Sequence, residues 1–157
     1  MSAGATPLFR SSGQRGFSST LSSDRRRVEA RKFEREVQVR FTPEACTVQT
    51  PEGVVHAQPG DAIVTGVAGE RWRVSRTHFA EKYRPVPHTL AGEAGAYLSL
   101  RTHILALQMP GPFEVLLADG RSKLTGKADD WLVDYGDGSL GIVSPAIFAT
   151  TYEILGR

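Results

Sequence analysis

Short apolar runs separated by glycine-containing turns recur along the chain in two sets. The first set comprises residues 46–50, 62–65 and 71–74, and the second comprises residues 113–117, 131–134 and 140–143. Runs of four or five residues bounded by Pro, Gly and Asp are typical of β-strands joined by tight turns. Each set is followed by a serine, which caps helices well, and by two aromatic residues four positions apart, which share a helix face. Each set therefore predicts a β-β-β-α unit.

The two sets match each other position by position. Pairs lying 69 positions apart are Asp61–Asp130, Val64–Val133, Gly69–Gly138, Ser75–Ser144, Phe79–Phe148 and Tyr83–Tyr152. Upstream the offset is 67, and it pairs Pro43 with Pro110 and Gly53 with Gly120. A constant offset across turn, strand and ring positions indicates duplication of a supersecondary unit.

A unit of about 40 residues rarely buries enough apolar surface to fold alone. We therefore expect a mainly β (α+β) protein in which two tandem repeats form one compact, pseudo-twofold body, preceded by an extended or helical arm. The predicted parts are a targeting-like or extended arm at 1–23, a charged helical linker at 24–40, the first repeat at 41–88, a connector at 89–109 and the second repeat at 110–157. The apolar pattern of the connector favours strand pairing or a buried linker.

The first 23 residues differ in composition from the rest. They contain Arg10, Arg15, seven serines and no acidic residue. Such a composition is the signature of an organelle transit peptide, and residues 15–19 (RGFSS) resemble the site at which mitochondrial presequences are cut. The alternative is a disordered low-complexity tail. A retained arm has too little apolar surface to order itself, so we expect a partner to hold it wherever it is ordered.

Residues 24–40 predict a charged helix, because Ser23 or Asp24 can cap it and residues 25–36 contain no Gly or Pro. It is either a solvated linker or a basic docking segment for an acidic protein surface, RNA or anionic lipid. A second partner-contact segment is predicted in the strand where Arg71 and Arg73 flank Trp72. Packing of the Trp72 ring in the core is the alternative. The predicted partner-contact residues are Arg25, Arg26, Arg27, Phe33, Arg71, Trp72 and Arg73.

Charge is divided unevenly along the chain. Residues 1–40 carry nine Lys/Arg against four Asp/Glu, and residues 41–157 carry ten against thirteen. A nucleic-acid-binding domain usually concentrates positive charge on its folded surface, which this body does not. No apolar run approaches the roughly 18 residues that span a bilayer, and a single cysteine excludes an internal disulfide.

No residue set predicts catalysis, a metal site or a cofactor. The acidic residues Asp129, Asp130, Asp134 and Asp137 offer carboxylate ligands for a cation, but they lie where the repeat requires a hairpin turn. The four histidines are widely separated, and Cys46 is interpreted as a small buried apolar residue in a strand. The basic segment 120–127 is either a phosphate contact or a solvated hairpin flank. We therefore expect no cofactor and no enzymatic activity.

Residues 59–72 (PGDAIVTGVAGERW) resemble a small module of phage and bacterial proteins, whose pattern is Pro-Gly-Asp, an apolar strand, Gly-Glu, an aromatic residue and then spaced Phe and Tyr. Phe79 and Tyr83 fill the last two positions, so the resemblance covers about 30 residues of the first copy. The second copy departs from it, with Ala128-Asp129-Asp130 in place of Pro-Gly-Asp. The resemblance implies a fold and no particular activity.

These features together favour a non-catalytic accessory (supernumerary) structural subunit of a mitochondrial multiprotein complex, docked by its arm on the matrix side of the inner membrane. The acidic body favours a respiratory-chain complex or ATP synthase over the mitochondrial ribosome, whose proteins usually carry basic charge to face RNA. The alternatives are an RNA-associated or mitochondrial ribosomal accessory protein, and a module that binds a small ligand between the two copies.

Overall fold

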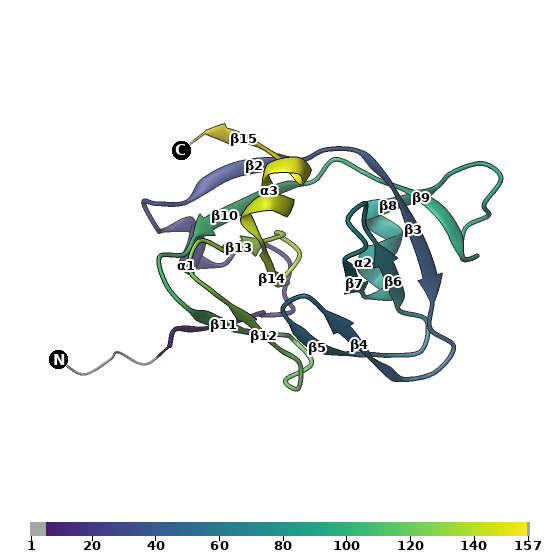
Figure 1. The fold of residues 1–157 in the computed structure, drawn as a ribbon, viewed down its shortest axis with the longest axis horizontal. Coiled ribbons are helices and arrows are strands. Elements are labelled where there is room, and N and C mark those ends of the chain that lie inside the picture. The colour runs from purple at the N-terminus through teal and green to yellow at the C-terminus, as the bar shows by residue number, and fades with distance from the viewer. Residues whose placement is uncertain (1–5, 157) are drawn as a thin grey trace. The chain divides into compact units, whose positions relative to one another are not determined.

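A computed structural model of the protein describes residues 6–156, and the chain is mainly β, as the sequence predicts (Figure 1). It divides into two compact units. Unit 2 is the continuous segment Lys32–Thr102, and unit 1 combines the residues up to Arg31 with those from His103 onward. No helix among the described residues is long and apolar enough to cross a membrane.

Unit 2 contains a five-stranded antiparallel sheet in the order β7-β6-β3-β9-β8 and a separate hairpin of β4 and β5. Its elements are β3 (Arg35–Phe41), β4 (Cys46–Thr50), β5 (Gly53–Ala57), β6 (Ala62–Thr65), β7 (Arg71–Val74), α2 (Arg76–Lys82), β8 (Tyr83–Pro85) and β9 (Gly95–Ser99). Phe79 and Tyr83 stack at 4.7 Å and pack against the sheet residues Val39, Val64 and Tyr97. These rings form the core of unit 2.

Unit 1 contains a five-stranded sheet in the order β14-β13-β10-β2-β15 and a three-stranded sheet in the order β1-β11-β12. Its elements are β1 (Leu8–Arg10), α1 (Ser19–Ser22), β2 (Val28–Lys32), β10 (His103–Gln108), β11 (Phe113–Leu116), β12 (Lys123–Gly126), β13 (Trp131–Asp134), β14 (Leu140–Val143), α3 (Pro145–Thr151) and β15 (Tyr152–Gly156). In its core, Phe148 stacks on Trp131 at 4.1 Å and on Tyr152 at 4.9 Å.

The six strands predicted from the apolar runs are present, and so are both short helices. Ser75 and Ser144 are the helix caps, and each side chain accepts a hydrogen bond from the backbone N–H three residues later. The predicted connector also forms strands, because it contains β9 and β10. The turn and cap signals therefore predict these elements correctly. The two rings of each set do not share a helix face: Tyr83 and Tyr152 follow the helices in extended backbone and begin β8 and β15, although each stacks on the preceding phenylalanine.

The charged helix predicted at 24–40 is wrong, because this segment forms β2 and β3. Apolar residues alternate with charged or polar ones in both strands, and Val28 and Ala30, then Val37 and Val39, are buried. Alternation of period two suits a half-buried strand. Pairing with β10 and β9, distant in the sequence, outweighs the helix-forming composition.

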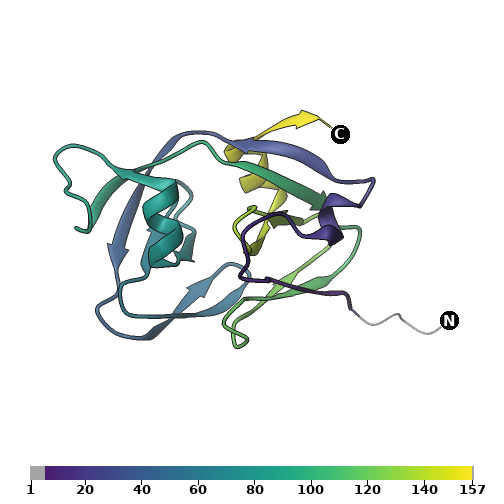
Figure 2. The ribbon, with the colours of Figure 1, turned by 180° about the vertical axis from the view of Figure 1, so that it is seen from behind.

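The expectation that a partner must hold the N-terminal arm is also wrong for residues 7–23, because unit 1 itself holds them (Figures 1 and 2). β1 pairs in parallel with β11, and the backbone N–H groups of Gly13 and Gly16 donate to the carbonyls of Gly138 and Gly136 at 2.9 and 2.8 Å. α1 lies against β10, with Leu21 fully buried. Backbone hydrogen bonds and one buried leucine thus replace the apolar surface that the arm lacks.

A pair of glycine substitutions measures how closely the arm is seated. Gly138 and Gly69 both have positive φ, at 91° and 80°, but a Cβ on Gly138 would lie 2.4 Å from the backbone of Gln14, whereas Gly69 faces open space. We expect Gly69→Ala to cost about 1 kcal/mol of stability from backbone strain alone. Gly138→Ala adds a clash worth about 1–3 kcal/mol. Urea unfolding of both variants checks this, and equal losses would contradict a seated arm.

Candidate functional site: the Asp61–Arg73 network

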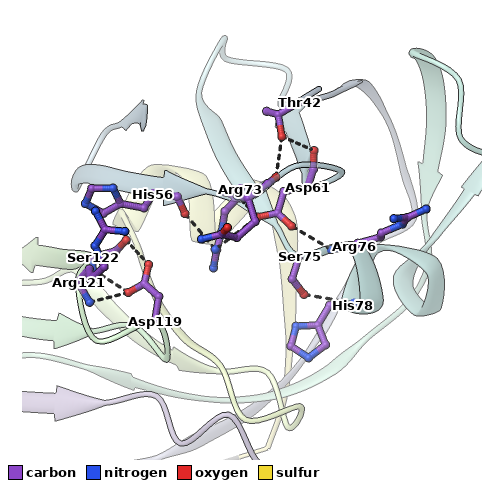
Figure 3. A network of polar contacts seen from close by, with 11 residues as sticks. Thr42, His56, Asp61, Arg73, Ser75, Arg76, His78, Asp119, Arg121 and Ser122 are labelled. Carbon is purple, nitrogen blue, oxygen red and sulfur yellow. Dashed lines mark hydrogen bonds and ion pairs between the residues drawn. The ribbon is translucent and has the colours of Figure 1, made fainter. Parts of the chain in front are cut away.

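The Pro59-Gly60-Asp61 turn of unit 2 is built around one buried carboxylate. Asp61 is 5% exposed and directly precedes β6. Its Oδ2 accepts a hydrogen bond from the Gln58 backbone N–H at 2.9 Å, and its Oδ1 accepts one from the Arg76 backbone N–H at 3.3 Å (Figure 3). One side chain therefore fixes both the turn before β6 and the first residue of α2.

Arg73, on β7, supplies the charge that faces this carboxylate. Its guanidinium Nη1 lies 3.6 Å from Asp61 Oδ2 and donates to the backbone carbonyl of His56 at 3.1 Å (Figure 3). The Arg73 side chain is 19% exposed, and its Nε has no hydrogen-bond partner among the described residues. A buried ion pair of this kind is costly to break from either side, because the remaining charge stays desolvated.

Thr42 closes the turn from the end of β3. Its hydroxyl donates to the Gln58 carbonyl at 2.8 Å, and its own backbone carbonyl accepts from Gly60 at 2.7 Å. Asp61 is thus engaged by two backbone amides and a guanidinium. A carboxylate held in this way braces a turn, whereas a general base needs an acceptor oxygen directed at a substrate proton.

Unit 1 has a reduced version of the same arrangement. Asp130 is also 5% exposed, and its Oδ2 accepts from the Lys127 backbone N–H at 3.1 Å. Its Oδ1 is buried with no partner among the described residues. The first residue of α3 is Pro145, which has no N–H to donate, and Ile142 occupies the β14 position that corresponds to Arg73 in β7.

Restoring the missing donor is expected to stabilise unit 1. Pro145→Ala supplies an N–H at the position from which Arg76 bonds Asp61, and a hydrogen bond to a charged group contributes about 1.5–3 kcal/mol. The lost proline rigidity costs about 0.4–1 kcal/mol, so a net gain remains. The reverse change in unit 2, Arg76→Pro, should destabilise it. Chemical denaturation of both variants checks the pair, and a less stable Pro145→Ala protein would contradict the assignment.

The other residues predicted to contact partners lie apart from this network. Trp72 is half-buried beside the unit 2 core and donates from Nε1 to the Tyr83 hydroxyl at 3.4 Å, while Lys32 Nζ lies 5.6 Å from its ring. This position supports the packing alternative for Trp72. Arg71, on the same edge strand, is exposed. The structure places Arg73 in the Asp61 network, and its role as a partner contact stays a prediction.

Arg25 and Arg26 are exposed in the turn before β2, Arg27 is half-buried, and Phe33 is 41% exposed between β2 and β3. Arg26 pairs with Asp24 at 3.0 Å, and this hydrogen-bonded guanidinium lowers the pKa of the Asp24 carboxyl. These residues remain candidates for partner contact.

The acidic residues of the second repeat act in turns. Asp134 is 1% exposed and accepts from the backbone N–H groups of Ser18 at 2.7 Å and Gly136 at 3.0 Å, and Asp137 accepts from Ser139 at 2.9 Å. No cluster of three or more metal-ligating side chains occurs among the described residues. The turn alternative is thus supported. Cys46 was wrongly predicted to be buried: it lies at the exposed start of β4, whereas Val48 further along that strand is buried.

The structure shows a structural role for Arg73, which the sequence predicts only as a partner contact. Arg73 lies opposite Ile63, two residues beyond Asp61, so the strand register explains why β7 carries an arginine there. The signal available in the sequence was the difference between copies, Arg73 and Arg76 in one against Ile142 and Pro145 in the other. That difference indicates that the carboxylate of Asp61 has an ion-pair partner and a second amide donor, which Asp130 lacks within the described part of the chain.

Comparison with known proteins gives one match. No curated protein and no solved structure matches the chain. Residues 53–153 match the sequence pattern of a family described as PGDYG protein. The match confirms the resemblance seen in the Pro-Gly-Asp segment and extends it through the second set of strands. Because the match covers more than half of the chain, the protein belongs to the PGDYG protein family.

Proposed function

We propose that the protein is a non-catalytic accessory structural subunit of a mitochondrial multiprotein complex, on the matrix side of the inner membrane. The observation that carries this proposal is the use of the buried acids. Asp61, Asp130, Asp134 and Asp137 all accept hydrogen bonds from backbone amides of turns. Carboxylates that accept hydrogen bonds from turn amides stabilise the fold, and this use of the buried acids suits a structural subunit more than a catalyst.

The mitochondrial part of the proposal is supported by the transit-peptide-like composition of the first 23 residues. We further propose that residues 7–23 remain in the working protein, since they pair with β11 and bury Leu21 in unit 1. Docking then uses the exposed Arg25 and Arg26, which follow the arm in the chain, and the exposed Phe33. The acidic body favours a respiratory-chain complex or ATP synthase as the host.

An RNA-associated or mitochondrial ribosomal role is the second candidate. It is favoured by the net positive charge of residues 1–40 and by the exposure of Arg25 and Arg26. RNA binding through phosphate contacts would weaken steeply as salt is raised. Protein docking through Phe33 would depend much less on salt.

We also propose that the two units descend from one duplicated module with an exchanged strand. The sheet orders β7-β6-β3-β9-β8 and β14-β13-β10-β2-β15 correspond strand by strand. The registers agree as well: Val39–Val64 and Val64–Trp72 in unit 2 correspond to Ala106–Val133 and Val133–Gly141 in unit 1. β2 and β9 occupy equivalent places in the two sheets. In the chain, however, β2 directly precedes β3 of unit 2, and β9 directly precedes β10 of unit 1.

Such an exchange supports the tandem duplication expected from the sequence. Nuclear Overhauser effects between Ala30 and Ile104, and between Val37 and Tyr97, are the expected signals. Contacts pairing β2 and β9 with the strands that follow them in the chain would contradict it.

Affinity purification from native cells at mild salt, with N-terminal sequencing of the bait, tests the proposed function. We expect recovery in a large mitochondrial complex with the arm retained. The double variant Arg25→Glu/Phe33→Ser should lose the complex while the folded body persists. Arg121→Glu, which reverses an exposed charge in the β11–β12 turn, is the matched control. Recovery alone, or with RNA only, would overturn the proposal.

A further inference from the structure

The C-terminal strand β15 is an edge strand with apolar side chains on both faces. Within the described residues its neighbour in the sheet is β2. Ile154 is 39% exposed and Leu155 is 47% exposed. Consecutive strand residues point to opposite sides of a sheet, so each face of this edge exposes one apolar side chain. The strand also contains no proline.

Two other sheet edges, β8 and β14, carry the usual protection. β8, the edge strand in the same position of unit 2, has three residues, ends in Pro85 and exposes Arg84. β14, the opposite edge of the unit 1 sheet, lies beside β11 and β12. Charge, proline and coverage are the means by which proteins keep edges from pairing. Among the described residues β15 has neither a proline nor a further strand beyond it in the sheet, and Glu153 is its one charged residue.

The one charged residue of β15 is already neutralised. Glu153 pairs with Arg31 on β2 at 2.9 Å. A second copy of this strand therefore brings no uncompensated like charge to the edge. Two antiparallel strands related by a twofold axis present identical surfaces to each other, which is the isologous arrangement of most homodimers.

We propose that β15 is a homodimer interface, in which β15 of one chain pairs antiparallel with β15 of a second copy about a twofold axis near Ile154. Backbone hydrogen bonds join the strands, and Ile154 and Leu155 of both copies are covered on the two faces. Five residues per chain form a small interface, so we expect a dissociation constant on the order of 10–100 µM. The proposal does not depend on the mitochondrial host.

Sedimentation analysis of the untagged full chain, from about 1 µM to about 1 mM, tests this interface. The average mass should rise from one chain towards two. Ile154→Lys should keep the protein monomeric across the range, because a lysine on the edge opposes pairing. Val67→Lys changes a 74% exposed valine in a unit 2 turn and should dimerise like the wild type. A wild-type protein that stays monomeric, or a dimer that survives Ile154→Lys, would overturn the proposal.

Cross-linking locates the axis independently of affinity. In a Cys46→Ser background, Ile154→Cys should form a disulfide-linked dimer on mild oxidation, since paired strands bring equivalent residues within disulfide range. Val67→Cys is the matched control and should stay largely monomeric. Equal cross-linking of the two variants would reflect random collision and contradict a twofold axis at Ile154.

Discussion

Deletion of residues 1–23 is expected to destabilise unit 1 by about 3 kcal/mol or more while leaving unit 2 intact. The deletion removes the fully buried Leu21, whose burial contributes about 1.5–3 kcal/mol. It also removes the arm's backbone hydrogen bonds to β11 and to Gly136 and Gly138, worth about 0.5–1.5 kcal/mol each before the entropy of ordering the arm is subtracted. Asp134 additionally loses the amide of Ser18.

Each unit contains one tryptophan, which allows the units to be followed separately. Trp131 lies in the core of unit 1 and Trp72 beside the core of unit 2. Urea unfolding in a Trp72→Phe background therefore reports unit 1, and in a Trp131→Phe background it reports unit 2. Leu21→Ala should reproduce part of the loss, and Thr20→Ala, an exposed change in the same helix, should have little effect. An unchanged unit 1 midpoint after the deletion would contradict an integral arm.

The sequence does contain a signal for the surface that the arm covers, but this signal lies in β10 and not in the arm. Leu105 and Leu107 are buried on the face of β10 opposite the α3 cluster, and α1 lies against this strand. At the offset of 67, the corresponding residues of β3 are the exposed Gln38 and Arg40. Leucines in β10 at the positions of polar residues in β3 thus indicate that this face of the strand is covered in unit 1 and exposed in unit 2. Composition of the arm gave no such information.

Local signals predicted elements well, and long-range pairing decided the rest. Turn glycines and the helix cap Ser75 depend on neighbours within a few residues, so the sequence predicts them directly. β2 pairs with β10, more than seventy positions away, and the charged residues between its buried ones favoured a helix until that pairing was known. β15 and β12 were missed for the same reason, since short strands carry weak local signals.

The candidate site was predictable as a turn but not as a network. Pro-Gly-Asp indicated the bend before β6, but the engagement of Asp61 by Arg73 depends on the β6–β7 register and that by Arg76 on where α2 begins. Arg73 beside Trp72 suggested an exposed contact strand. The pairing of Arg73 with Ile63 instead directs its guanidinium to the carboxylate.

The second large effect concerns this carboxylate. Asp61→Ala is expected to destabilise unit 2 by about 3–5 kcal/mol, because it leaves the Arg73 guanidinium without its counter-ion and two turn amides without their acceptor. Asp130→Ala, the matched change in unit 1, removes an acceptor of one amide and no ion pair, so it should cost about 1–3 kcal/mol. Tryptophan-resolved urea unfolding measures both.

A double variant separates the ion pair from the turn. Arg73→Ile places in β7 the residue type that Ile142 provides in β14, and in the Asp61→Ala background it removes the stranded charge. We expect Asp61→Ala/Arg73→Ile to be more stable than Asp61→Ala, because a packed apolar side chain costs less than an unpaired buried cation. Strict additivity of the two single changes would show that Asp61 and Arg73 do not interact, and the role assigned to Arg73 would then be withdrawn.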